Sequence, residues 1–258
     1  MLTSLQNPLV KEIRKLHQAK VRRQRGQFLL EGTHLIQEAL ALGYPLTVAC
    51  HTQAWAQRYP DLATTLQEHT PQIETVSEAV LEAMATTVHP DGIIAIAPQR
   101  RLAHPPTIRG IGVFLDGIQD PGNLGTIIRT AAATGADGLW LSPSSVAPDH
   151  PKVLRASAGQ WFRLPIEVRA DVEGLVQGWR QAGVQLVATQ PGIGQDYWEA
   201  DLTGPTVLML GNEGTGLSDC WQQQATVTVT IPMQAGVESL NVAICAALLL
   251  YEAKRQRG

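Results

Sequence analysis

Apolar residues in this chain gather in short runs that alternate with segments of helical periodicity. In the second half, six such runs predict strands at 111–115, 138–141, 164–168, 184–189, 207–210 and 226–231. The segments between and after them predict helices at 124–134, 152–158, 172–181 and 240–254. Strands that are apolar throughout are buried on both faces. This half of the chain is therefore predicted to form a mainly parallel sheet with helices on both sides.

The first part of the chain carries a less regular α/β pattern. Helices are predicted at 8–20 and 33–42, with further helical patterns between short strands at 28–31, 46–50, 73–76 and 93–97. Residues 98–110 combine three prolines with basic side chains, which is typical of an interdomain linker. We therefore expect a small α/β domain at 1–97, a linker at 98–110 and a larger α/β domain at 111–258.

Composition narrows the class of protein. Hydrophobic residues make up 44% and charged residues 17% of the 258 residues, as in a soluble globular protein. The longest apolar run, 242–251, is shorter than the roughly 18 residues that indicate a membrane span. The N-terminal segment is polar and basic, unlike a secretory signal, so a cytoplasmic location is expected. The three cysteines and seven histidines show no metal-ligand spacing, so no metal is expected.

Positive charge is concentrated near the N-terminus, although the whole chain carries a net charge of −3. Seven basic residues and a single acid, Glu12, lie within residues 1–25. Such a run could be a solvated helix face or a segment that contacts phosphates, and its clustering at one end favours the second reading. The candidate phosphate contacts are Lys11, Lys15, Arg22, Arg23 and Arg25.

The first of three polar motifs, DGIQDPGN at 116–123, follows the predicted strand 111–115. Asn123 is predicted to cap the next helix, and Arg129 lies about one and a half turns into it. The motif could be only a capped turn with a solvated arginine. However, small and apolar residues surround Arg129, which indicates that its guanidinium projects from a packed helix toward a partner.

The second motif, GNEGTGLS at 211–218, follows the predicted strand 207–210. Its glycines, Gly211, Gly214 and Gly216, do not follow the GxGxxG order, and no GKS or GKT is present. A dinucleotide-binding or P-loop assignment is therefore weak. The loop offers instead close approach of its backbone to a ligand, together with the side chains of Asn212 and Glu213.

The third motif begins where the predicted strand 226–231 stops at Pro232, and it leads into the last helix. Ser239 could be an N-cap and Asn241 a first-turn residue, or both could face a ligand. The helix is apolar on nearly every face. Such a helix lies in a core or at a subunit interface.

Together these segments resemble the three signature motifs of the SpoU/TrmH class of SPOUT methyltransferases, in order and spacing, over about 111–257. The segments NPLVKEIRKL at 7–16 and FLLEGTHLIQEAL at 28–40 are similar to the substrate-binding domain of ribosomal RNA (rRNA) 2′-O-methyltransferases of this class. The resemblance implies methyl transfer from S-adenosyl-L-methionine to a ribose 2′-hydroxyl of RNA, most simply 23S rRNA. It also implies a deep trefoil knot in the C-terminal part of the sheet, an exception to the rule against threaded chains.

The resemblance further implies roles for individual residues. Arg129 matches the catalytic arginine of the class, with Asn123, Glu213, Ser239 and Asn241 around the ribose. Because a guanidinium keeps its proton, we expect Arg129 to clamp an RNA phosphate and stabilise the developing alkoxide. The cofactor contacts carried over are Gly211, Ile231 and Leu240, with Asn212 and Met233 beside them. Family resemblance also implies a homodimer whose active sites draw on both subunits.

Three alternatives stay open at this point. A transfer RNA (tRNA) methyltransferase of the same class is disfavoured by the basic N-terminal domain, since tRNA enzymes of the class more often carry short helical extensions. A non-catalytic RNA-binding relative is disfavoured by the presence of the complete polar set. A dinucleotide oxidoreductase is disfavoured by the order of the glycines.

Overall fold

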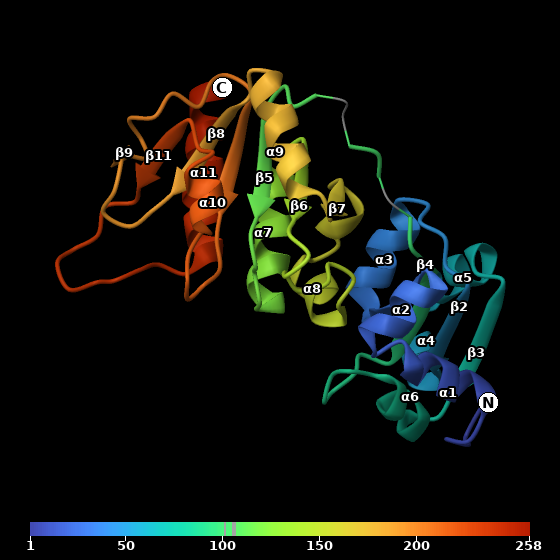
Figure 1. Cartoon of the computed structure of the whole chain (residues 1–258). Helices are drawn as coiled ribbons and strands as arrows, with labels where there is room; N and C mark the ends of the chain where they lie inside the picture. Colours follow the sequence, from blue (N-terminus) through green and yellow to red (C-terminus); the bar gives the residue numbers. More distant parts are fainter. Residues whose placement is uncertain (101, 105–106) are drawn as a thin grey trace. The chain divides into compact units, whose positions relative to one another are not determined.

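The computed structural model describes residues 1–100, 102–104 and 107–258. Arg101, Pro105 and Pro106, which belong to the predicted linker 98–110, lie outside the described residues. The chain forms two compact units (Figure 1). The first unit contains Met1–Arg100 and Asp149–Phe162, and the second contains Arg101–Pro148 and Arg163–Gly258.

The first unit is built on a mixed four-stranded sheet. Its strand order is β1 (Gln27–Glu31), β4 (Ile93–Pro98), β2 (Val48–Thr52) and β3 (Gln72–Val76). Strand β4 runs antiparallel to both of its neighbours, and β2 runs parallel to β3. The helices of residues 1–100 are α1 (Pro8–Lys15), α2 (Ala19–Arg25), α3 (Thr33–Ala41), α4 (Gln53–Arg58), α5 (Pro60–His69) and α6 (Glu78–Met84).

The predicted continuous helix at 8–20 is wrong, because the chain breaks into α1 and α2. Helix α1 buries Val10 and Ile13, and Leu16 follows them into the same apolar cluster as the helix ends. The ring of His17 then makes a hydrogen bond with the carbonyl of Met84, 2.8 Å away. Burial of Leu16 and this hydrogen bond turn the chain, so the basic residues 20–25 belong to a separate helix.

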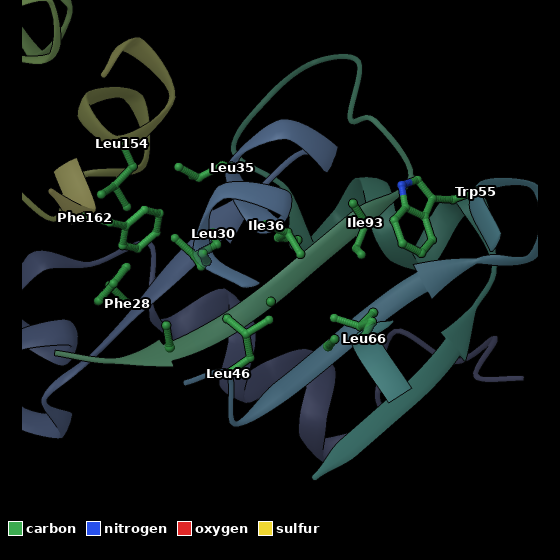
Figure 2. Packing of buried hydrophobic residues seen from close by; sticks show 14 residues of the cluster. Phe28, Leu30, Leu35, Ile36, Leu46, Trp55, Leu66, Ile93, Leu154 and Phe162 are labelled. Carbon is green, nitrogen blue, oxygen red and sulfur yellow. The ribbon is translucent and has the colours of Figure 1, made fainter. Parts of the chain in front are cut away.

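A segment from the middle of the chain completes the first unit. Helix α8 (Pro151–Ala156) and the short 3₁₀ helix Gln160–Phe162 lie in this unit, whereas the pattern alone placed 152–158 within the larger domain. Leu154 and Phe162 pack with Phe28 and Leu30 in one apolar cluster (Figure 2). The core of the first unit therefore depends on residues that follow it by about fifty positions in the sequence.

Polar contacts fasten this segment as well. The Arg155 guanidinium donates to the carboxylate of Glu31 at 2.8 Å, and the buried Glu31 also accepts from the backbone and hydroxyl of Thr86. The carboxylate of Asp149 accepts from Arg22 and Gln99. The segment is therefore held by both apolar packing and paired charges.

The second unit contains a seven-stranded sheet in which every described pairing is parallel. The strand order is β7 (Ile166–Val168), β6 (Gly138–Leu141), β5 (Ile111–Leu115), β10 (Thr206–Leu210), β8 (Gln185–Thr189), β11 (Val227–Thr230) and β9 (Gln195–Asp196). Strands β5 and β10 are buried along their whole length. The predicted parallel sheet is confirmed, and the two-residue strand β9 is an addition that its polar sequence did not indicate.

Helices cover the sheet of the second unit on both sides. Side chains of α9 (Val172–Gln181) and α10 (Asp219–Gln222) pack with Phe114 and Met209 in one apolar cluster. Val113 and Leu115 alternate with Phe114 along β5 and are buried on the opposite face. There α7 (Pro121–Thr134) and α11 (Val242–Arg257) pack against each other, and α11 also contacts β10. The α/β fold is confirmed, while the trefoil knot stays a prediction.

No helix in the described part of the chain has both the length and the apolar character needed to cross a membrane.

Candidate active site

The three polar motifs meet at one edge of the larger sheet. Strands β5, β10, β8 and β11 are consecutive neighbours and run parallel, so their carboxyl ends lie on the same side. The loops that follow β5, β10 and β11 contain the first, second and third motifs. Ligands of open α/β sheets bind at this edge.

Helix α7 begins earlier than its sequence suggested, and this releases Asn123 from a capping role. Asp120 is the N-cap, since its carboxylate accepts from the backbone N–H groups of Gly122 and Asn123 at 2.6 and 2.9 Å. Pro121 occupies the first helical position, which suits its fixed φ and missing N–H. The prediction that Asn123 caps this helix is therefore wrong, and its side chain is available for other contacts.

Helix α11 is capped by Asn241, so the predicted start at residue 240 is also wrong. The Asn241 side-chain oxygen accepts from the Ala243 backbone at 2.9 Å. Its amide nitrogen donates to the side-chain oxygen of Asn123 at 2.9 Å. Ser239 stays in the preceding loop. The N-cap of α11, Asn241, is thereby hydrogen-bonded to Asn123 in the first turn of α7.

Glu213 joins the second motif to the first. Its carboxylate accepts from the Asn123 amide and from the backbone N–H groups of Gln119 and Asp120, each at 3.1 Å. Burial raises the pKa of Glu213, but these hydrogen bonds outweigh it, so the pKa lies below its ordinary value. Glu213 is therefore a carboxylate at neutral pH, and the chain Glu213–Asn123–Asn241 links all three motifs.

Two adjoining cavities lie at these loops. The first, of about 490 Å³, is lined by four of the five predicted catalytic residues, Asn123, Glu213, Ser239 and Asn241. The second, of about 400 Å³, is lined by all five predicted cofactor residues, Gly211, Asn212, Ile231, Met233 and Leu240. Glu213, Ser239, Leu240 and Val242 line both cavities, which therefore share a wall.

Arg129 is the one predicted catalytic residue that the fold does not bring to these cavities. It lies exposed on α7 and lines neither of them. Within the described residues, no acceptor forms a hydrogen bond or an ion pair with its guanidinium. The side chain is therefore available to a partner outside this copy of the chain.

The second cavity has the character of a nucleoside site. Apolar side chains, among them Leu217, Val229 and Ile231, give it surface for a flat ring. Gln190, Gln222 and Glu238 add polar groups for hydroxyls and an ammonium group. These residues fit S-adenosyl-L-methionine, which combines a purine, a ribose and an amino acid.

Sequence reasoning missed one wall of this cavity. Thr189, Gln190 and Pro191 line it at the end of β8, which pairs directly with β10. The predicted strand 184–189 and the parallel sheet together contain the signal, because neighbouring parallel strands end at the same edge. The polar side chains of this turn lack the glycine-rich pattern that drew attention to 211–218.

The five predicted phosphate contacts separate into two groups, four that are exposed and one that is buried. Lys11, Lys15, Arg23 and Arg25 are exposed. Glu12 forms ion pairs with Lys15, at 2.6 Å, and with Arg25. Lys11 and Arg23 have no ion pair within the described part of the chain. The exposed set is open to a polyanion.

Arg22 does not belong with them. Its side chain is fully buried, and it donates to the carbonyl oxygens of Leu16 and His17 and to Asp149 at 3.0–3.2 Å. The prediction that Arg22 contacts an RNA phosphate is therefore wrong. Its place on α2 turns the side chain toward Asp149 and away from solvent.

Comparison with known proteins gives the family. The model of the SpoU rRNA Methylase family matches residues 110–251, and that of the MRM3-like substrate binding domain matches residues 7–95. The chain belongs to the SpoU rRNA methylase family. The resemblance inferred from the three motifs and from the N-terminal segments is confirmed, and with it the methyltransferase class.

Relatives match over nearly the whole length of the chain. An uncharacterised tRNA/rRNA methyltransferase of Synechocystis is 46% identical over 99% of this chain and 94% of its own. The 23S rRNA (guanosine(2553)-2′-O)-methyltransferase RlmP of Bacillus subtilis is 34% identical over 97% of each chain. The crystal structure of an AdoMet-bound rRNA methyltransferase from Sinorhizobium meliloti has a TM-score of 0.86 and 35% identity, covering 98% of this chain and 97% of that one.

Proposed function

We propose that this protein transfers a methyl group from S-adenosyl-L-methionine to a ribose 2′-hydroxyl of 23S rRNA. The observation that carries the proposal is the convergence of the three motifs on two adjoining cavities, one with the predicted cofactor residues and one with the polar residues. Relatives named as 23S rRNA 2′-O-methyltransferases, and structures of relatives with AdoMet bound, support it.

The second cavity is the proposed cofactor site, with Gly211, Ile231, Leu240, Asn212 and Met233 in its wall. The cofactor supplies a methyl group that its sulfonium already activates. Asn212 contributes by shaping the loop that lines the cavity, because its side chain is already occupied within the chain. Its oxygen accepts from the backbone of Gly214 and Thr215, and its nitrogen donates to the carbonyl of Gly117.

The first cavity is the proposed ribose site. Hydrogen bonds join Asn123 to Glu213 and to Asn241. These bonds fix the orientation of the three side chains and of the polar groups that they offer to a ligand. Ser239 adds a hydroxyl to the same wall. A site of this kind aligns the 2′-oxygen with the methyl group, which is the main task when the leaving group is already activated.

Arg129 is the proposed catalytic arginine. A guanidinium cannot act as a base, so we assign it to the phosphate beside the reacting ribose, which can accept the proton while Arg129 stabilises the alkoxide. Its position outside the cavities of its own chain supports an active site completed by a second copy.

A homodimer is therefore part of the proposal, with α11 at the interface. Ile244 and Tyr251 are 51% and 54% exposed and lie two helical turns apart, with Ala247 and Leu248 between them. Such a stripe on a helix is normally covered by a partner. We expect Ile244→Asp combined with Tyr251→Asp to convert the protein from dimer to monomer in gel filtration with light scattering.

The matched control for this variant is Gln177→Asp, on the exposed side of α9, which should leave the mass unchanged. Loss of the dimer should also abolish methyl transfer, since Arg129 would no longer reach a partner's cavities. An unmodified protein that is monomeric at micromolar concentration would contradict the proposed interface.

The first unit is the proposed RNA-binding part, with Lys11, Lys15, Arg23 and Arg25 as phosphate contacts. The match of residues 7–95 to a substrate-binding domain supports this. A solved structure described as giving insight into the 2-OH methylation of C/U34 on tRNA is similar to only 57% of this chain, with a TM-score of 0.52. That partial match favours rRNA over the tRNA alternative. We place the reaction in the cytoplasm.

The deciding experiment is a map of 2′-O-methyl groups in RNA from cells with and without the gene. One methylated ribose of 23S rRNA is expected to disappear, and purified protein with S-adenosyl-L-methionine should restore it on extracted RNA. Disappearance of a tRNA modification alone would contradict the assignment to rRNA.

A further inference from the structure

A buried carboxylate fastens the 211–218 loop to the end of β5. Asp116 directly follows β5 and is 8% exposed. Its Oδ2 accepts from the Ser218 backbone N–H at 3.3 Å and also from the Ser218 hydroxyl. Within the described residues it forms no ion pair. Because a buried carboxylate is costly without partners, the hydrogen bonds from Ser218 are essential to its place in the fold.

Ser218 closes a loop whose two ends touch. The backbones of Asn212 and Gly216 exchange two hydrogen bonds, of 3.0 and 2.9 Å. A Cβ atom at Gly211 would lie 1.9 Å from the nitrogen of Leu217, so no side chain can be placed there. The backbone of Leu217 therefore lies directly against Gly211. Because Ser218 is the next residue, a hydrogen bond that holds Ser218 also holds this end of the loop.

Every residue of 211–217 lines the second cavity, whereas neither Asp116 nor Ser218 does. The pair therefore acts on that cavity only through the loop. We propose that Asp116 and Ser218 are positioning residues for the cofactor, holding the loop in the shape that receives S-adenosyl-L-methionine. This inference rests on the proposed cofactor site.

The chemistry of this hydrogen bond suits the task. A hydrogen bond to an ionised carboxylate is roughly twice as strong as a neutral one. At the other end of the loop, the Asn212 side chain donates to the Gly117 carbonyl at 2.8 Å. A loop fixed at both ends is ordered before the cofactor arrives, so binding does not bear the cost of ordering it. Removal of the Ser218 hydroxyl should weaken cofactor binding and leave RNA binding unchanged.

The test uses the full-length protein and S-adenosylhomocysteine as the probe, with affinity measured by calorimetry. Ser218→Ala should raise the Kd by about tenfold, the effect of removing one charge-assisted hydrogen bond. The KM for S-adenosyl-L-methionine should rise by more than kcat falls. Ser218→Thr, which keeps the hydroxyl, should restore the affinity. Asp219→Ala, at the exposed neighbouring acid, is the matched control.

The affinities of the Ser218 variants distinguish the possible outcomes. Weaker binding by Ser218→Ala, measured well below the melting temperature of the variant and reversed by threonine, supports the inference even where that melting temperature falls. Unchanged affinity of Ser218→Ala contradicts it, as does a loss that follows the melting temperature and that threonine does not reverse. Failure of the unmodified protein to bind S-adenosylhomocysteine contradicts the proposed cofactor site itself.

Discussion

Replacement of Arg129 by alanine is expected to slow methyl transfer by about 10²–10³-fold, the usual cost of removing one group that stabilises transition-state charge. Arg129 is exposed and has no ion pair among the described residues, so the substitution should not disturb folding. Its proposed partner is an RNA phosphate and not the cofactor, so affinity for S-adenosylhomocysteine should stay unchanged. Single-turnover methylation of rRNA and calorimetry measure the two quantities separately.

Two further variants test the role of Arg129. Arg129→Lys keeps the charge but loses the planar fork that binds a phosphate through two hydrogen bonds, so it should recover only part of the rate. Arg180→Ala removes an exposed arginine of α9 that donates to Gln224, and it should leave the rate unchanged. Methylation by Arg129→Ala at most of the original rate, with cofactor affinity intact, would remove Arg129 from the mechanism.

The larger sheet could be predicted well because its signals are local. Strands β5 and β6 and helix α9 begin and end at the residues expected from sequence, 111–115, 138–141 and 172–181. Each is a periodic segment bounded by glycine, proline or aspartate. The cavity walls followed from the same pattern, because adjacent parallel strands place their loops at one edge.

Helix starts were harder to predict, because a turn such as DGIQDPGN offers several capping residues. Asp120 and Asn123 are both good caps, and the deciding factor is Pro121, which fits the first turn of a helix. The consequence is functional. An asparagine used as a cap would have its side-chain oxygen occupied by the backbone, whereas Asn123 bridges Glu213 and Asn241.

The position of α8 could not be predicted, because helical periodicity shows that a face is apolar but does not show which sheet covers it. Leu154 and Phe162 pack in the first unit, although the segment lies between strands β6 and β7 of the second. The nearest sheet in sequence is normally the partner of a crossover helix. Here the buried partners Glu31 and Arg22 attach the segment to the other unit.

Arg22 and Arg23 are identical neighbours in the sequence, and the structure predicts opposite results for them. Arg22→Ala should lower the free energy of unfolding by about 3–5 kcal/mol, the usual cost of removing one partner of a buried ion pair. It would leave the carbonyls of Leu16 and His17 without this donor and Asp149 with Gln99 alone among the described residues. Urea denaturation measures this loss.

Arg23→Ala should leave the unfolding free energy unchanged, because the side chain is exposed and without an ion pair in the described structure. It should instead weaken RNA binding and lower the salt dependence of that binding by about 0.7–0.9 for each phosphate that the arginine neutralises. Cofactor affinity should not change in Arg23→Ala. If Arg22→Ala were as stable as the unmodified protein, or Arg23→Ala bound RNA with an unchanged salt slope, the division of the basic segment into a structural and an RNA-binding arginine would be wrong. Adjacent positions on a helix differ by about 100° in direction, so α2 can bury Arg22 against Asp149 and still present Arg23 to solvent.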